Sequence, residues 1–272
     1  MVQHSTEMGN THSETCVLAD GAALRYRVEG ASGAPMLVLS NSLGTNLAMW
    51  DAQMPTLAQR FRVLRYDSRG HGASTNAAGP YAIAQLARDV LALLDHLDVP
   101  RVHFCGLSMG GMVGMWLGAH AEERIDRLAL CNTAPRIGSA ESWNARIDAV
   151  RKGGIEAIAD GVVGGWFTPA FRERAPRTIR QMRYMLIANP AEGYVAACAA
   201  VRDMNLWDAL PDIDRPTLII SGAHDVATPP ADGRRMAQEI SGARYAELDA
   251  AHISNVEQAE RFTAEVVDFL TA

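Results

Sequence analysis

The sequence lacks the features of several specialised classes of protein. Its 25 Lys and Arg residues are outnumbered by 31 Asp and Glu residues, which gives a net charge of −6 and leaves no basic stripe that could neutralise phosphates. No apolar run is long enough to span a membrane, and residues 1–14 are polar, without the apolar segment of a signal peptide. We therefore expect a cytoplasmic protein with no nucleic-acid partner and no membrane partner, whose first dozen residues form a frayed tail.

Cysteine is scarce, and the usual metal-binding spacings are absent. The four cysteines are far apart and form no C-x-x-C pair, so we expect reduced thiols rather than a disulfide framework. They are Cys16, Cys105, Cys131 and Cys198. The sequence has no H-E-x-x-H and no convergent histidine and cysteine spacing, so we predict no metal site.

Predicted strands and helices alternate over most of the chain. With 272 residues, 48% of them hydrophobic, the sequence can fill one large α/β core or two small domains. Continuous apolar runs predict buried parallel strands, and apolar residues at helical spacing predict the helices between them. Strands are expected at residues 36–40, 62–66, 102–107, 127–131, 216–221 and 244–248, and helices at 81–97, 112–119, 229–240 and 256–270. This order predicts a parallel sheet with helices on both faces.

The alternation stops after residue 133. From there to about residue 208 the sequence has only helical patterns. Four pairs of helix-breaking residues separate them: Gly153-Gly154, Gly164-Gly165, Thr168-Pro169 and Asn189-Pro190. A helical insertion of this size within an α/β sheet indicates a cap over a cleft. We predict a core made of residues 1–133 and 208–272 and a helical cap made of residues 134–207.

The most specific motif in the chain is Gly-Leu-Ser-Met-Gly at residues 106–110. An apolar run precedes it and a helical stretch follows, which is the context of a nucleophile elbow. We expect Ser108 in a strained backbone conformation with its Oγ in a cleft. Gly106 and Gly110 are expected there because a Cβ at either position would strike the neighbouring helix or strand. The Met109 amide would lie in the first turn of the helix, where it favours an anion.

Asp225 and His252 are the predicted partners of Ser108. A serine hydroxyl becomes a nucleophile when a base takes its proton, and an imidazole base needs a carboxylate to fix its tautomer. Asp225 follows the strand at 216–221 and His252 follows the strand at 244–248. Both are therefore expected at the edge of the sheet where Ser108 lies. The order serine, acid, histidine along the chain also fits a catalytic triad.

Other acids and histidines are weaker candidates for these roles. Asp249 is so close to His252 in sequence that the two side chains cannot easily face each other. The remaining acids precede the resumed sheet: Asp203, Asp212 and Asp214. His103 lies inside a predicted strand, and His71 lies in a Gly-rich turn whose backbone geometry explains it. His224 directly precedes the predicted acid and is expected to point elsewhere.

Two regions are expected to bind the substrate. A tetrahedral oxyanion needs two donors, and we predict the amides of Met109 and Leu43, with Ser42 beside them in the substrate site. The alternative is that this loop is a plain tight turn. In the predicted cap, Trp143 and Arg146 fall on one face of a helix, where Arg146 could clamp a substrate carboxylate or lay its stem over Trp143.

Together these motifs resemble the α/β-hydrolase superfamily, and more closely the 3-oxoadipate enol-lactonases of bacterial aromatic catabolism. The resemblance runs from about residue 16 to residue 270. Its widely shared motifs lie at residues 41–44, 67–72, 106–111 and 250–257; the narrower ones are Trp-Phe-Thr-Pro at 166–169 and Thr-Pro-Pro at 228–230. Asn41-Ser42 stands where many relatives have His-Gly, so only the backbone role of that loop carries over.

The resemblance implies an α/β-hydrolase fold with a mostly parallel eight-stranded sheet, helices on both faces and a helical cap. It further implies a small-molecule lactone substrate, no cofactor, and hydrolysis of 3-oxoadipate enol-lactone to 3-oxoadipate through an acyl-enzyme, in the degradation of protocatechuate or catechol. Another serine carboxylesterase, lactonase or C–C bond hydrolase on this fold is the alternative, and a ligand receptor derived from a hydrolase is less favoured. The sequence leaves open whether the chain forms a homo-oligomer.

Overall fold

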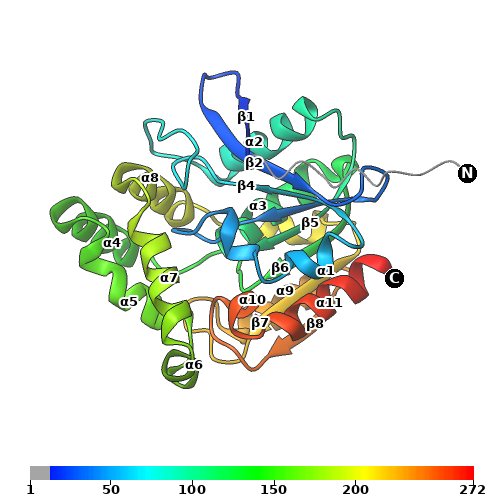
Figure 1. The fold of residues 1–272 in the computed structure, drawn as a ribbon. Helices are drawn as coiled ribbons and strands as arrows, with labels where there is room; N and C mark the ends of the chain where they lie inside the picture. The colour runs from blue at the N-terminus through cyan, green and yellow to red at the C-terminus, as the bar shows by residue number, and fades with distance from the viewer. Residues whose placement is uncertain (1–12) are drawn as a thin grey trace, which may run out of the picture.

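An eight-stranded sheet forms the centre of the computed structural model, which describes residues 13–272 (Figure 1). The expected frayed tail at the start of the chain lies outside these residues. The strand order is β1-β2-β4-β3-β5-β6-β7-β8; the pairings of β2 with β1 and β4 are antiparallel and the others are parallel. The strands are β1 (Glu14–Val17), β2 (Ala23–Glu29), β3 (Met36–Ser40), β4 (Arg62–Tyr66), β5 (Val102–Leu107), β6 (Ile125–Cys131), β7 (Thr217–Gly222) and β8 (Arg244–Leu248). The predicted mostly parallel sheet is confirmed.

Helices cover both faces of this sheet (Figure 1). The helices of the core are η1 (Leu47–Trp50), α1 (Met54–Leu57), α2 (Ile83–His96), α3 (Met109–His120), η2 (Glu122–Arg124), η3 (Trp207–Asp212), α9 (Pro230–Glu239), α10 (Ser254–Glu257) and α11 (Ala259–Thr271). On one face α2 packs against α3, and η3 contacts both α3 and α9; on the other, α1 packs against α11. Because both faces are covered, every residue of β3 and β7 is buried, as their continuous apolar runs predicted. None of the helices within residues 13–272 is long and apolar enough to cross a membrane.

Between β6 and β7 the chain leaves the sheet and forms a helical insertion beside it, which we call the cap (Figure 1). Its helices are α4 (Ala140–Gly153), α5 (Glu156–Trp166), α6 (Pro169–Arg174), α7 (Pro176–Ile187) and α8 (Ala191–Arg202). Ser139 begins the first of them with a capping box, because its hydroxyl accepts from the Ser142 amide and the Ser142 hydroxyl lies 3.1 Å from the Ser139 amide. The helical insertion is therefore present, while the division of the chain at residues 134 and 207 stays a prediction.

The structure differs from the predicted helix pattern at Gly164-Gly165 and at Gln258. The pair Gly164-Gly165 lies inside the last turn of α5 and does not end the helix; a Cβ on Gly165 would meet nothing within 4 Å. The predicted helix at residues 256–270 is broken at Gln258, which has φ −125° and ψ 50°. The cause is tertiary, because the Asn255 side chain in α10 donates to the Met49 carbonyl at 2.9 Å and holds that turn against the core.

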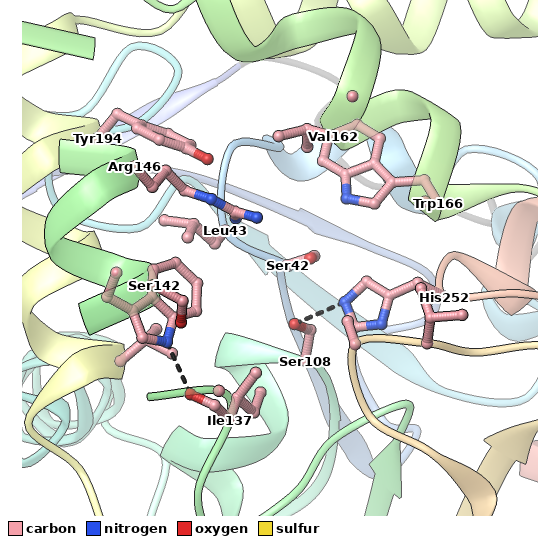
Figure 2. Close-up of a pocket in the computed structure, with 17 residues that line it drawn as sticks. Ser42, Leu43, Ser108, Ile137, Ser142, Arg146, Val162, Trp166, Tyr194 and His252 are labelled. Carbon is pink, nitrogen blue, oxygen red and sulfur yellow. Dashed lines mark hydrogen bonds between the residues drawn. The ribbon is translucent and has the colours of Figure 1, made fainter. Parts of the chain in front are cut away.

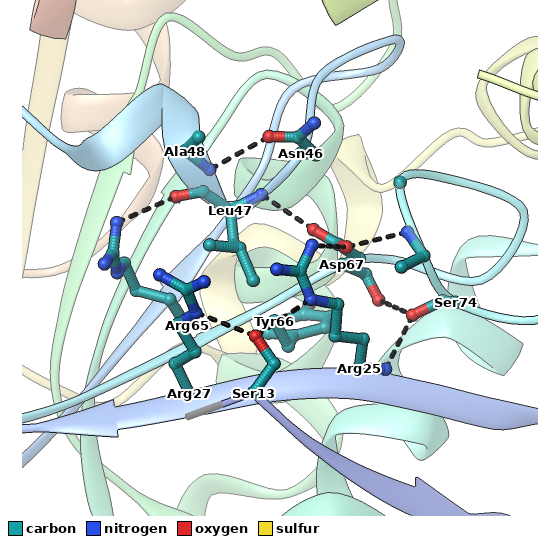
Figure 3. Close-up of polar contacts among 12 residues, drawn as sticks. Ser13, Arg25, Arg27, Asn46, Leu47, Ala48, Arg65, Tyr66, Asp67 and Ser74 are labelled. Carbon is teal, nitrogen blue, oxygen red and sulfur yellow. Dashed lines mark hydrogen bonds and ion pairs between the residues drawn. The ribbon is translucent and has the colours of Figure 1, made fainter. Parts of the chain in front are cut away.

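A buried carboxylate holds together the loops that follow β3 and β4 (Figure 3). The Oδ1 atom of Asp67 accepts from the Leu47 amide at 2.8 Å, and its Oδ2 atom accepts from the Ala73 amide at 2.9 Å. Arg25 on β2 lies 3.4 Å from Oδ2 and supplies a compensating charge. A Cβ on Gly72, which has φ +54°, would come within 2.3 Å of this carboxylate, so the loop closes here only with glycine. The core itself therefore fixes this edge of the sheet.

All four cysteines of the chain are buried and free, which confirms the expected unpaired thiols. The sulfur atoms of Cys105 on β5 and Cys131 on β6 lie 3.9 Å apart, too far for a covalent bond. Burial raises the pKa of the Cys131 thiol, so it behaves as a small apolar side chain between neighbouring strands.

Candidate active site

Ser108 stands at the turn between β5 and α3, in the strained geometry that the motif predicted. Its φ of 57° and ψ of −115° lie outside the regions that L-residues favour, at a cost of roughly 1–3 kcal/mol. A Cβ on Gly106 would come within 2.1 Å of the Gly110 carbonyl, and one on Gly110 within 2.2 Å of the Ser40 carbonyl. The hydroxyl of Thr133 donates to the Ser108 carbonyl at 2.8 Å and helps to hold the turn. The predicted reason for both glycines is therefore confirmed.

The structure brings Ser108, His252 and Asp225 into one hydrogen-bonded chain. His252 Nε2 lies 2.8 Å from Ser108 Oγ (Figure 2). On the other side of the ring, His252 Nδ1 lies 2.8 Å from Asp225 Oδ2. Only 5% of His252 and 3% of Asp225 is exposed, so water competes little for these bonds. With its proton on Nδ1, the imidazole donates to the carboxylate and leaves Nε2 free to accept the serine proton. The arrangement can therefore convert the hydroxyl of Ser108 into a nucleophile.

The environment of Asp225 keeps its carboxyl group ionised. Burial alone would raise the pKa of Asp225, but the adjacent His252, together with hydrogen bonds from His252 and Thr228, outweighs burial and lowers the pKa to about 2. Thr228 donates twice, through its amide to Oδ1 at 3.0 Å and through its hydroxyl to Oδ2 at 2.6 Å. The narrow Thr-Pro-Pro motif thus begins with a direct partner of the carboxylate.

Asn132 is a partner of this site that the sequence analysis missed. Its Nδ2 donates to Asp225 Oδ2 and to the Ala251 carbonyl, both at 3.1 Å, so it ties the acid to the loop that carries His252. Its φ is +43°, a conformation that asparagine tolerates better than most residues. A signal was present, because Asn132 follows β6 directly at the edge of the sheet where Ser108 lies.

Four of the rival acids and histidines contact other residues. Asp249 pairs with His224 at 2.8 Å on the surface, so neither takes part in the chain of bonds around His252. Asp203 forms an exposed ion pair with Arg202 at 2.7 Å. His103 lies on β5, where its ring packs edge-on against a phenylalanine of the core.

The two predicted oxyanion donors lie at the ends of β3 and β5. Within residues 13–272, neither the Leu43 amide nor the Met109 amide has a hydrogen-bond partner. Leu43 is oriented through the peptide group that it shares with Ser42, whose carbonyl accepts from the Thr45 amide at 3.2 Å and from the Thr45 hydroxyl at 2.7 Å. The carbonyl and N–H of a trans peptide point in opposite directions, so fixing the Ser42 carbonyl also fixes the direction of the Leu43 N–H.

The next residue in this loop, Gly44, is held through both of its backbone polar groups. The Gly44 amide donates to His71 Nε2 at 3.0 Å, and the Gly44 carbonyl accepts from Asn189 Nδ2 of the cap at 2.8 Å. Burial lowers the pKa of His71, which keeps the ring neutral and able to accept. Backbone geometry alone is therefore an incomplete explanation of His71, because its side chain braces the loop that carries Leu43.

A cavity of about 350 Å³ opens above Ser108, between the core and the cap (Figure 2). All three predicted substrate-binding residues line it: Ser42, Trp143 and Arg146. Other lining residues include Leu43, Ile137, Ser142, Val162, Trp166, Tyr194, Val226 and His252. Trp166 and Phe167 of the cap are both buried, and Trp166 also lines the cavity. The volume of this cavity suits a small-molecule ligand.

The cap side of this cavity carries polar groups without partners. Arg146 lies over Trp143, with Cζ 4.7 Å from the ring centroid, so the stem-over-ring alternative and a role in the cavity are compatible. Within residues 13–272 no acid pairs with Arg146. The buried Tyr194 hydroxyl also lacks a hydrogen-bond partner. The sequence analysis missed Tyr194, whose one signal is that it is the only aromatic residue of α8. Both polar groups are therefore free to pair with a ligand in the cavity.

No group of three or more His, Cys, Asp or Glu side chains in the described part of the chain is arranged to hold a metal ion.

Comparisons with known proteins identify relatives over nearly the whole chain. The alpha/beta hydrolase fold family matches residues 35–153. The chain is 42% identical to 3-oxoadipate enol-lactonase 2 of Acinetobacter baylyi, over 94% of this chain and 96% of that protein, and 36% identical to 3-oxoadipate enol-lactonase 1 of the same organism, with the same coverage. The crystal structure of the enol-lactonase from Burkholderia xenovorans LB400 matches with a TM-score of 0.94 at 50% identity, over 95% of this chain and 100% of that chain.

Proposed function

The chain belongs to the α/β-hydrolase family and is an enol-lactonase-like hydrolase; from that premise we propose that it hydrolyses 3-oxoadipate enol-lactone to 3-oxoadipate. The observation that supports this substrate best is the unpaired Arg146, which lies across the cavity from Ser108 (Figure 2). A lactone that carries a short carboxylate arm would present its carbonyl to Ser108 and its charge to Arg146. The cavity of about 350 Å³ suits a ligand of that size.

In the first step, Ser108 Oγ attacks the lactone carbonyl carbon while His252 Nε2 takes the hydroxyl proton. The Asp225 carboxylate accepts a hydrogen bond from the Nδ1–H of His252 and stabilises the imidazolium that forms. The amides of Leu43 and Met109 hold the negative oxygen of the tetrahedral intermediate. Each donor of this kind typically stabilises the transition state by about 2.7–4 kcal/mol.

The intermediate then collapses with cleavage of the ring C–O bond. The departing oxygen leaves as an enolate and takes a proton from the His252 imidazolium, and the enol that results becomes a ketone. Because an enolate is a better leaving group than a simple alkoxide, this step needs less help from the acid. Because the ester is cyclic, the leaving oxygen stays on the same molecule, and the whole opened substrate remains attached to Ser108 as an ester.

Water completes the reaction. His252, again neutral, removes a proton from a water molecule that attacks the ester carbonyl, and the same two amides hold the second oxyanion. Collapse of this intermediate returns the proton to Ser108 Oγ and releases the free acid. The net change is the addition of one water across one C–O bond, with no oxidant or reductant.

The cap supplies recognition in this proposal. The guanidinium of Arg146 binds the substrate carboxylate, and Tyr194 adds a neutral donor. Burial raises the pKa of the Tyr194 hydroxyl, so it stays protonated and donates. Trp143 and Ser42 shape the walls between this subsite and Ser108.

A substrate panel tests the proposal. Purified protein is assayed with 3-oxoadipate enol-lactone, an enol-lactone that bears methyl in place of the carboxymethyl arm, simple aryl esters and a vinylogous diketo acid. We expect the highest kcat/KM for the first, and a loss of about 10⁴-fold or more in the Ser108→Ala variant. An aryl ester or the diketo acid as the best substrate would make the protein an esterase or a C–C bond hydrolase instead. Binding without turnover of any compound would indicate a ligand receptor.

A further inference from the structure

The cap touches the chain on the carboxyl side of His252. The amide of Ile253 donates to the carbonyl of Trp166 at 3.0 Å. Trp166 is the last residue of α5, so its carbonyl has no partner within that helix. The peptide that follows His252 is therefore bonded to the end of a cap helix.

A buried carboxylate makes the matching connection on the other side of His252. The Oε2 atom of Glu257 accepts from the Ala251 amide at 3.0 Å and from the Thr168 amide of the cap at 3.2 Å. The hydroxyl of Thr168 donates to Oε1 of the same carboxylate. Both neighbours of His252 in the chain are thus tied to the end of α5 and the segment after it, Ile253 directly and Ala251 through Glu257.

Burying the carboxylate of Glu257 costs free energy that hydrogen-bond donors must offset. Only 6% of it is exposed, and within residues 13–272 no Lys, Arg or His forms an ion pair with it. Its charge is stabilised by hydrogen-bond donors alone, from the core through Ala251 and from the cap through Thr168. If the cap moved away from the core here, the carboxylate would lose most of its donors. The bonds therefore favour the docked position of the cap.

We propose that Thr168 and Glu257 are positioning residues for His252. This pair, which we call the Thr168–Glu257 latch, docks the cap and at the same time holds the loop of His252, so that Nε2 stays within reach of Ser108 Oγ. The inference rests on the proposed role of His252 as the base that activates Ser108. It adds that the cap acts on the chemistry as well as on substrate recognition.

The test uses substitutions that separate the latch from general stability. Thr168→Val removes the hydroxyl at nearly constant volume, whereas Thr168→Ser keeps it. The same hydroxyl also caps α6, because it accepts from the Phe171 amide at 3.2 Å, so Thr168→Val should lower stability as well. Thr263→Val is the matched control: its hydroxyl bonds only within α11, to the Ala259 carbonyl at 2.6 Å, away from the cavity. Glu257→Gln removes the charge from the other half of the latch.

The main measurement is the rate at which a fluorophosphonate probe labels Ser108, because labelling reports activation by His252 whatever the natural substrate is. We expect labelling and kcat to fall about 10-fold to 100-fold in Thr168→Val and Glu257→Gln, with KM nearly unchanged, since a small displacement of a base is enough for such a loss. Thr168→Ser should retain at least about half of the wild-type labelling rate. Thr263→Val should keep it, and urea unfolding of every variant separates a loss of stability from a loss of labelling.

Several outcomes would overturn the inference. Wild-type labelling in a folded Thr168→Val variant would show that the latch does not position His252. An effect on KM alone would limit Thr168 to shaping the cavity, and equal losses in Thr168→Ser and Thr168→Val would mean that the hydroxyl is not responsible. A wild-type protein that the probe does not label would instead refute the activation of Ser108, and with it both this inference and the proposed function.

Discussion

The two walls of the cavity differ in how their polar atoms are paired. On the core wall, Ser108, His252 and Asp225 bond to one another, and the carboxylate has further donors in Thr228 and Asn132. On the cap wall, the guanidinium of Arg146 has no ion pair within residues 13–272, and the Tyr194 hydroxyl has no hydrogen-bond partner.

This difference separates reactivity from recognition. Groups that perform chemistry gain from being held in place before the substrate arrives, because reorganisation during the reaction would raise the barrier. Groups that recognise a substrate gain from being left unsatisfied, because only a ligand that pairs with them avoids the cost of desolvating them. The core wall has the first property and the cap wall the second. Four substitutions or conditions test whether the two walls behave this differently.

The largest expected effect is on the core wall. Asp225→Asn replaces a carboxylate with an amide whose nitrogen disfavours the Nδ1–H tautomer of His252. We expect kcat for the enol-lactone to fall by about 10⁴-fold while KM changes little. Steady-state kinetics measure both constants, and circular dichroism checks the fold. A loss confined to KM would mean that Asp225 belongs with the recognition groups.

On the cap wall, Arg146→Gln should change KM rather than kcat, the reverse of the result expected for Asp225→Asn. Loss of a charge-assisted hydrogen bond to the substrate carboxylate should raise KM by about 10-fold to 100-fold, with kcat changed much less. Arg146→Lys keeps the charge but loses the planar pair of donors, so its KM should lie between those of wild type and Arg146→Gln. The enol-lactone that bears methyl in place of the carboxylate arm should be insensitive to both variants. Equal losses for the two substrates would contradict this assignment.

A smaller effect is expected at the loop that carries Leu43. Thr45→Val removes the hydroxyl that fixes the Ser42 carbonyl, so the Leu43 amide loses part of its orientation without being removed. We expect kcat to fall about tenfold, a fraction of the cost of losing an oxyanion donor outright. Thr45→Ser retains the hydroxyl and should behave as wild type. Should the valine variant keep full kcat, the Thr45 amide alone would be sufficient to hold the loop.

The smallest expected effect is on the free energy of unfolding at acidic pH. Because the folded pKa of Asp225 is about 2, below its ordinary value of 3.8, its ionisation stabilises the fold above that ordinary value, and this contribution is lost as pH falls from about 3.8 toward 2. Urea unfolding at pH 6 and pH 3 should therefore show that the stability advantage of wild type over Asp225→Asn shrinks at pH 3. Tyr194→Phe should show no such dependence, because burial keeps the Tyr194 hydroxyl neutral throughout. A constant advantage for Asp225 would place its pKa near the ordinary value.

Local signals in the sequence were enough for the sheet and the elbow. Apolar runs and helical spacing depend on neighbours in the chain, and Gly106 and Gly110 mark a turn whose steric demands are short-range. Asp225 and His252 could be chosen because each follows a strand, and parallel strands bring their ends to one edge. The sequence therefore predicted that these side chains share one edge of the sheet, but it could not predict the distances between them.

What the sequence analysis missed depends on contacts between distant segments. Nothing near Tyr194 in the chain indicates that its hydroxyl faces the cavity, because that depends on how α8 packs against α4. The break at Gln258 likewise follows from the bond between Asn255 and Met49, 206 residues apart in the chain. His71 was explained by its turn alone, since the sequence does not reveal that its ring reaches Gly44.

The two backbone hydrogen bonds of Gly44 have one further consequence, for protein engineering. Its N–H is held by His71 of the core and its carbonyl by Asn189 of the cap. Exchanging caps between relatives is an obvious route to new specificity, and it treats the cap as an independent module. A transplanted cap without an amide side chain at the position of Asn189 would leave that carbonyl unsatisfied and disturb a loop that the graft never touched. Chimeras should therefore retain asparagine at position 189, whichever relative supplies the cap helices that precede it.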